Sequence, residues 1–85
     1  MNWYDEFIEE GIRKEVRLLR ENGFNTISSS GDKKVIDCML HIDGDLQRLH
    51  DLLYNNNYKF YIIESYLEIE DGRITNNFVT VSFRD

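Results

Sequence analysis

The C-terminal third of the chain reads as one long β-hairpin, and this hairpin restricts the fold more than any other segment. Residues 58–69 are rich in aromatic and β-branched side chains, and residues 74–83 alternate in a similar way. Between them stands Asp71-Gly72, a dipeptide that favours the tight turns joining antiparallel strands. The first strand carries bulk on both faces: Tyr61, Ile63, Leu67 and Ile69 on one, and Tyr58, Phe60, Ile62 and Tyr66 on the other. Both faces of the sheet therefore need a cover.

The apolar pattern of this hairpin does not fit a strict two-residue turn. In that register Ile63 would oppose Thr80, and half of the apolar side chains would face the wrong side of the sheet. The sequence therefore predicts either a three-residue loop, Asp71-Gly72-Arg73, or a β-bulge near Asn76-Asn77. The cross-strand pairs then expected are Ile63 with Val81 and Tyr61 with Phe83.

The remaining segments complete the order αββαββ. Apolar residues from Trp3 to Leu19 recur at helical spacing, and Asn22-Gly23 provides a helix stop. Period-two alternation predicts strands over residues 24–29 and 35–42, and a second helical stripe follows: Leu46, Leu49, His50 and Leu53. We expect a single α+β domain over residues 1–85, a two-layer sandwich with two helices on one face of a four-stranded sheet. The strand order stays open: the strands joined by the second helix are parallel if they are neighbours, and otherwise the two hairpins pack in another order.

A four-stranded sheet with helices on one side leaves its other face open. Strand alternation assigns several apolar side chains to that face, enough to exceed the patch that monomers usually expose. We expect a protein partner there, most simply a second copy of the chain. The residues predicted to bind it are Val35, Met39, Phe60, Ile62, Tyr66 and Phe78. The alternative is that sheet twist lets termini and loops cover part of the patch.

Composition limits which partners and compartments fit. With 16 Asp and Glu against 10 Lys and Arg, the net charge of −6 disfavours direct binding to nucleic acid. The single cysteine, Cys38, has no internal partner for a disulfide, which suits a reducing compartment. No apolar run reaches the roughly 20 residues that span a bilayer, and the acidic start of the chain is unlike a signal peptide. We expect a cytoplasmic protein that does not contact a membrane.

Three consecutive serines and a glycine separate the first two predicted strands. Ser28, Ser29 and Ser30, with Lys33 and Lys34 just beyond, supply hydroxyls and cations that can hold an anion. A phosphate-binding loop also needs a helix that begins after its glycine, and the sequence predicts none there. A plain turn is therefore the favoured interpretation, with anion binding as its alternative.

The chain offers few groups for catalysis or metal binding, and we expect no cofactor. Cys38 and His41 are three residues apart on one strand, so their side chains point to opposite faces and do not share an ion. His50 lies on the predicted core stripe and reads as a buried, hydrogen-bonded histidine. No nucleophile–base pair or nucleotide-binding fingerprint is found. The sequence therefore predicts a protein that is not an enzyme, with no catalytic or metal-binding residue.

Acidic residues gather at two places in the chain. They are Asp5, Glu6, Glu9 and Glu10 near the start, and Glu64, Glu68 and Glu70 on one face of the long strand. The plain interpretation is a solvated acidic surface. The sharper one is that such rows imitate nucleic-acid phosphates and occupy the basic groove of a nucleic-acid-binding protein.

The chain resembles small, mostly uncharacterised bacteriophage and prophage proteins in two stretches, RLLRENGFNTISSSG and DGDLQRLHDLLYNNNYKFY. Those proteins carry a Gly-Phe-x-Thr segment, a Ser-Cys-x-Gly-His-like turn, a second helix and a hairpin. The matching residues are Gly23, Phe24, Thr26, Ser28 and Gly31. Ser29 stands in place of the cysteine and Asp32 in place of the histidine, so no thiol or metal role carries over. The resemblance implies a phage-associated origin and not a reaction.

Three hypotheses for function follow. The first is a non-enzymatic phage-type interaction protein, such as an acidic, anti-CRISPR-like inhibitor of a host nucleic-acid-binding defence protein. The second is a small ligand- or nucleotide-binding or catalytic domain that uses the turn from Ser28 to Gly31. The third is a structural subunit of a phage assembly.

Overall fold

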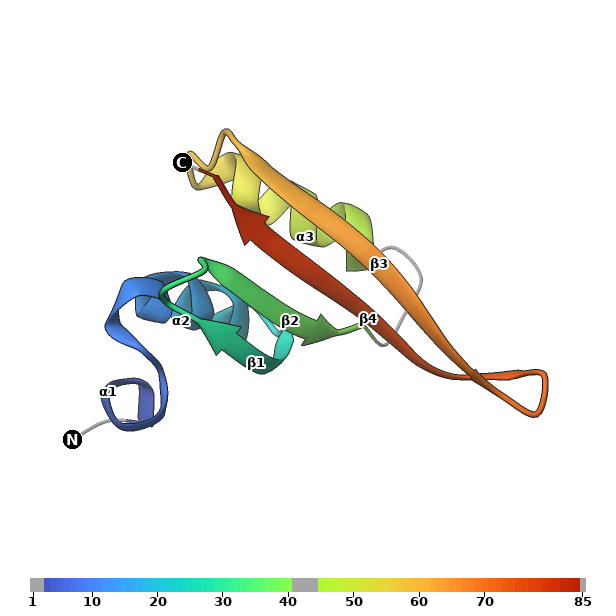
Figure 1. The fold of residues 1–85 in the computed structure, drawn as a ribbon. Coiled ribbons are helices and arrows are strands. Elements are labelled where there is room, and N and C mark those ends of the chain that lie inside the picture. Colours follow the sequence, from blue (N-terminus) through green and yellow to red (C-terminus); the bar gives the residue numbers. More distant parts are fainter. Residues whose placement is uncertain (1–2, 41–44, 85) are drawn as a thin grey trace.

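The computed structural model describes residues 3–40 and 45–84 and has an α+β fold (Figure 1). Its helices are α1 (Trp3–Phe7), the short 3₁₀ helix η1 (Glu10–Ile12), α2 (Arg13–Glu21) and α3 (Asp45–Asn55). Its strands are β1 (Asn25–Ser30), β2 (Val35–Met39), β3 (Tyr61–Glu70) and β4 (Arg73–Phe83). The predicted α+β class is confirmed: the four strands form one sheet, and α2 and α3 bury their apolar residues against one face of it.

The strands are ordered β1-β2-β4-β3, and every neighbouring pair is antiparallel. β2 therefore pairs with β4, while the chain passes through α3 to the far edge of the sheet before β3 begins (Figure 1). Of the two arrangements left open by the sequence, the structure adopts the one in which the strands joined by the helix are not neighbours. β1 and β3 are the two edge strands.

The β3–β4 hairpin contains the bulge that its apolar pattern predicts. The turn itself has two residues, Asp71 (φ 52°) and Gly72 (φ 74°), both in the left-handed region. The register then shifts between Glu68 and Ile69, which leaves Thr75 as the extra residue on β4, beside the predicted position. Beyond the bulge Ile63 faces Val81 and Tyr61 faces Phe83, so the predicted register is confirmed.

The N-terminal segment is not the single helix that its apolar spacing predicts. α1 ends at Phe7, and the chain passes through an extended Glu9 (φ −58°, ψ 141°) into η1 and α2. Gly11 lies at the break, where a Cβ atom would stand 2.9 Å from the carbonyl oxygen of Gly31. The turn between β1 and β2 thus packs directly on the η1 backbone, and this contact competes with a continuous helix.

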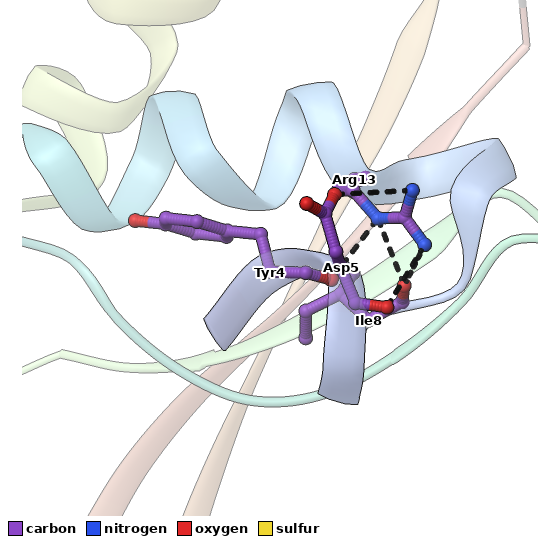
Figure 2. Close-up of polar contacts among 4 residues, drawn as sticks. All are labelled: Tyr4, Asp5, Ile8 and Arg13. Carbon is purple, nitrogen blue, oxygen red and sulfur yellow. Dashed lines mark hydrogen bonds and ion pairs between the residues drawn. The ribbon is translucent and has the colours of Figure 1, made fainter. Parts of the chain in front are cut away.

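Arg13 ties the broken segment together (Figure 2). Its Nε donates hydrogen bonds to the carbonyl oxygens of Tyr4 (3.0 Å) and Ile8 (3.1 Å), and its Nη2 donates to the Ile8 oxygen at 2.9 Å. The same guanidinium pairs with the Asp5 carboxylate at 3.4 Å. The Tyr4 carbonyl also accepts the Ile8 N–H at 3.1 Å, whereas the Ile8 carbonyl lies beyond the end of α1 and is bonded by Arg13 in place of a further helical turn.

One cluster of buried side chains joins the helices to the sheet. The inward face of β2 is as predicted, since Ile36 and Cys38 are fully buried and Leu40 nearly so. Ile42, expected to continue this face, lies outside the described residues. The buried apolar residues are Ile12, Val16, Leu19, Phe24, Ile36, Cys38, Leu40, Leu49, Leu53, Val79, Val81 and Phe83.

The buried line of α3 is one residue away from the predicted stripe. Leu49 and Leu53 are fully buried as expected, but Leu46 is 45% exposed and His50 is also exposed. Asp45 takes the buried position one turn before Leu49, and the Arg48 guanidinium pairs with its carboxylate at 3.2 Å. The prediction that His50 is a core residue is therefore wrong. The buried line of α3 runs through Asp45, Leu49 and Leu53, so Leu46 and His50, each one residue further along the chain, lie at the surface.

Truncating Leu53 tests this assignment of the α3 face. We expect Leu53→Ala to lower the free energy of unfolding by about 2–5 kcal/mol, because it leaves a cavity in a closed core. The matched change Leu46→Ala on the same helix should cost less than about 1 kcal/mol, since that side chain is half exposed. Urea unfolding followed by circular dichroism measures both. Equal losses would contradict the orientation of α3.

Candidate functional site

The face of the sheet opposite the helices, here called the open face, is organised in rows that run across the strands. One row consists of Met39, Phe78 and Tyr66, which are cross-strand neighbours on β2, β4 and β3. A second consists of Val35, Ser82 and Ile62. Five of the six residues predicted to bind a partner therefore lie on neighbouring strands of one surface.

These side chains differ in how far they are exposed. Val35, Met39 and Phe78 are half-buried, whereas Ile62 is 42% and Tyr66 48% exposed. Phe60, at 64%, is the most exposed of the six and precedes β3, where its carbonyl oxygen accepts a hydrogen bond from the Arg84 N–H at 2.9 Å. The open face is therefore apolar in part, with its most accessible groups on β3.

A polar row crosses the open face between the two apolar rows. Asp37 lies at its centre, and its carboxylate accepts hydrogen bonds from Ser28 Oγ at 2.5 Å and from Thr80 Oγ1 at 2.6 Å. Glu64 on β3 is the cross-strand neighbour of Thr80 and continues the row to the sheet edge. The sequence pattern assigned Ser28 to the candidate anion site and Glu64 to an acidic row, but it assigned Asp37 and Thr80 to no site, although the alternation of residues 35, 37 and 39 already places Asp37 on this face.

The polar row and the aromatic row meet at an open pocket. Its volume is about 260 Å³, and it is lined by Ile27, Asp37, Tyr66, Phe78 and Thr80. Ile27 is the residue at which the register of β1 with β2 shifts. Beside the pocket the Tyr66 hydroxyl donates to Glu64 at 3.4 Å. The arrangement combines carboxylates with aromatic rings, which suits the binding of an organic cation.

The serine turn is occupied by the protein's own groups. The Gly31 N–H donates to the Glu9 carboxylate at 2.7 Å, and the Lys34 ammonium donates to the carbonyl oxygen of Gly11. Ser30 Oγ accepts a hydrogen bond from the Lys33 N–H at 3.2 Å. The Gly31 N–H and the Lys34 ammonium, both candidates for anion binding, thus already donate to other groups of the chain. The group bound at Gly31 is a carboxylate of the same chain.

Of the other predicted anion-binding residues, Ser28 contributes to the polar row of the open face instead of the turn. Ser29 pairs with Ile36 in the β1–β2 ladder, where it is half-buried. Lys33 is exposed. The serines and lysines predicted to bind an anion therefore do not converge on one point.

The groups with intrinsic reactivity are spread over the fold. Cys38 is fully buried, and burial together with the nearby Asp37 charge raises the pKa of its thiol to about 12. His50 lies on the exposed flank of α3 beside β3, where its ring stacks on Tyr54 and also lies 6.1 Å from the ring of Tyr61. His41 lies outside the described residues. In the described ranges 3–40 and 45–84, no three His, Cys, Asp or Glu side chains gather closely enough to hold a metal ion.

The two acidic groups seen in the sequence have different surroundings. Asp5 and Glu9 hold internal partners, Arg13 and the turn at Gly31. On β3, Glu68 accepts hydrogen bonds from Thr75 Oγ1 and Asn76 Nδ2 at the bulge, at 3.4 and 2.7 Å. Glu64 is exposed beside the pocket, where it accepts a hydrogen bond from the Tyr66 hydroxyl at 3.4 Å. Of the residues in the two acidic groups, Glu64 is therefore the one placed beside the pocket.

Comparison with known protein families, curated proteins and solved structures finds no match for this chain. Among the residues that the structure describes, none of the helices has the length and apolar character that crossing a membrane requires.

The raised pKa of Cys38 predicts a loss of stability in alkaline solution. The unfolded thiol ionises above its ordinary pKa of 9.0, while the folded thiol stays protonated to about 12, so ionisation favours unfolding in this window. We expect this one group to lower the free energy of unfolding by about 1.4 kcal/mol per pH unit there. Urea unfolding at a series of pH values, compared with Cys38→Ala, isolates the effect. Parallel pH profiles for the two proteins would contradict it.

Because the serine turn already holds groups of the protein itself, we expect that inorganic phosphate does not bind there in the native protein. The Glu9 carboxylate already bonds the Gly31 N–H and repels anions, so the Gly31 amide resonance should not move when phosphate is added. In Glu9→Ala, added phosphate should shift the Gly31 amide resonance, because this N–H no longer donates to a carboxylate of the chain. Glu10→Ala, which removes a neighbouring charge, serves as the control. A phosphate-dependent shift at Gly31 in the native protein would restore the ligand-binding hypothesis for this turn.

Proposed function

We propose that this protein is a small, non-enzymatic interaction protein that binds a basic protein partner through its open face. The observation that carries the proposal is the polar row between two apolar rows, with the Asp37 and Glu64 side chains directed to the same surface as Tyr66 and Phe78. Interfaces of this kind combine aromatic anchors with a few placed polar groups. An active site would instead need reactive groups that converge, and among the described residues Cys38 and His50 lie on different elements, β2 and α3.

Charge supports a partner of opposite sign. The chain has a net charge of −6, and among the described residues the three rows of the open face contain carboxylates but neither lysine nor arginine. A basic partner gains from this field in its rate of association and in its specificity. A nucleic-acid-binding protein presents such a surface, so the protein would act as an inhibitor that competes with nucleic acid for a basic groove.

The resemblance to phage and prophage proteins supplies a biological setting for this inhibitor. A phage-encoded protein of this size and charge would act in the cytoplasm of the infected host on a nucleic-acid-binding defence protein, in the manner of an anti-CRISPR protein. Its small size suits a stoichiometric inhibitor, which needs one complementary surface and no catalytic machinery.

A homodimer through the open face is the second candidate, and the apolar row of Met39, Phe78 and Tyr66 favours it. In a two-fold dimer, however, each copy meets the same surface of the other. The Asp37 and Glu64 carboxylates of both copies would then share one interface, and like charges there cost free energy. We therefore rank a basic partner above a second copy.

Capture from a bacterial host lysate tests the proposal, with light scattering of the purified protein as a companion measurement. The immobilised native protein should retain a nucleic-acid-binding protein of high isoelectric point, and added DNA or RNA should displace it. Tyr66→Lys, which places a cation on the open face, should abolish retention. Glu70→Lys introduces the same ammonium group next to the hairpin turn and should leave retention intact.

Three results would overturn this function. They are retention that survives Tyr66→Lys, a retained protein that is not displaced by nucleic acid, and a stable dimer that dissociates on Tyr66→Lys. The last result would establish the second candidate instead.

A further inference from the structure

We propose that the pocket at Asp37 on the open face is a receptor for one arginine side chain of the partner. This inference deepens the proposed function and rests on it. The occupant follows from what lines the pocket: the Asp37 carboxylate, held by two hydrogen bonds, and the aromatic rings of Phe78 and Tyr66, with the Glu64 carboxylate nearby.

The Asp37 carboxylate is oriented before any partner arrives. Ser28 Oγ donates to its Oδ2 at 2.5 Å, and Thr80 Oγ1 donates to its Oδ1 at 2.6 Å. Each carboxylate oxygen has two lone pairs, so both oxygens keep acceptor capacity after these bonds. A guanidinium presents two parallel N–H groups at the spacing of the two oxygens, which allows a bidentate pair. Because both neighbours hold the carboxylate in place, little rotamer freedom remains to be lost on binding.

The aromatic rings select a guanidinium over a compact ammonium. Phe78 and Tyr66 are cross-strand neighbours and line the same pocket of about 260 Å³. A planar, weakly hydrated guanidinium stacks on such rings while it donates in its plane to a carboxylate. A lysine ammonium keeps more of its hydration and makes a single-point contact. A volume of about 260 Å³ has room for a single side chain.

Glu64 supplies a second negative charge next to the pocket. It is exposed on the edge strand β3 and lies across from Thr80, while the Tyr66 hydroxyl points to its carboxylate at 3.4 Å. The described residues of the three rows include neither lysine nor arginine, so no cation within these rows competes with an incoming arginine. An anion or a wholly apolar segment would leave Asp37 and Glu64 without compensation at the interface.

Titration with short peptides of one repeated residue tests the inference. The probes are acetylated, amidated tetra-arginine, tetralysine and tetracitrulline, and the readout is the backbone amide spectrum of the full chain. Tetra-arginine should shift the resonances of Asp37, Glu64, Tyr66 and Phe78. Tetralysine should bind roughly two- to fivefold more weakly because it lacks stacking, and the uncharged tetracitrulline should not bind.

Two variants and a matched control locate the contact. Glu64→Gln should weaken tetra-arginine binding roughly two- to fivefold, as expected for an exposed ion pair. Tyr66→Leu should remove the preference for arginine over lysine, while its amide spectrum reports that the fold is retained. Glu70→Gln removes the same charge from β3 near the turn and should have no effect. Equal losses from Glu64→Gln and Glu70→Gln, or equal binding of arginine and lysine peptides, would overturn the receptor.

The outcome separates this inference from the proposed function. If lysate capture depends on Tyr66 but the peptide shifts no open-face resonance, the receptor is wrong and the docking function stands. If the peptide binds at the pocket as expected and nothing is captured, the receptor stands and the inhibitor function is wrong.

Discussion

The inserted residue at Thr75 in the β3–β4 hairpin determines which side chains of the last strand reach the core. Without it, Val79, Val81 and Phe83 would face away from the apolar residues of β3 that lie on the helix side. With it, Val79 and Val81 are fully buried against the helices. The same shift aligns Phe78 with Tyr66 and Thr80 with Glu64 on the opposite face. The core and the proposed docking surface are therefore two results of one register.

Two features of the fold could be predicted because they depend on residues that are close together in the sequence. The hairpin register follows from the alternation on both sides of Asp71-Gly72, since only one offset puts Ile63 opposite Val81. The inward face of β2 follows from the spacing of Ile36 and Cys38. Strand alternation also assigned the apolar residues of the open face to one surface. Period-two patterns work where a strand has one face against the helices and one against solvent, as on β2, whereas β3 beyond Ile63 is exposed on both faces.

The failures have a common physical origin in contacts between distant segments. Apolar spacing cannot report that the backbone at Gly11 meets Gly31, and so it predicts one helix where there are two pieces joined by Arg13. The spacing on α3 likewise cannot reveal that Asp45 is buried with Arg48 as its partner. In the same way, Asp37 acquires its role only when the pairing of three strands brings Ser28 and Thr80 to its two oxygens. The candidate pocket was therefore beyond what the pattern alone could show.

The position of β3 at the sheet edge has a consequence for how the protein behaves at high concentration. A ten-residue strand with one unpaired side offers a row of backbone donors and acceptors to any other chain that can extend the sheet. Glu64, Glu68 and Glu70 recur along this rim, and a second copy aligning itself there would bring its own three glutamates alongside. Their mutual repulsion discourages polymerisation into fibres. The acidic residues of β3 thus protect the free rim of the sheet, and among them Glu64 also shapes the surface that faces a partner.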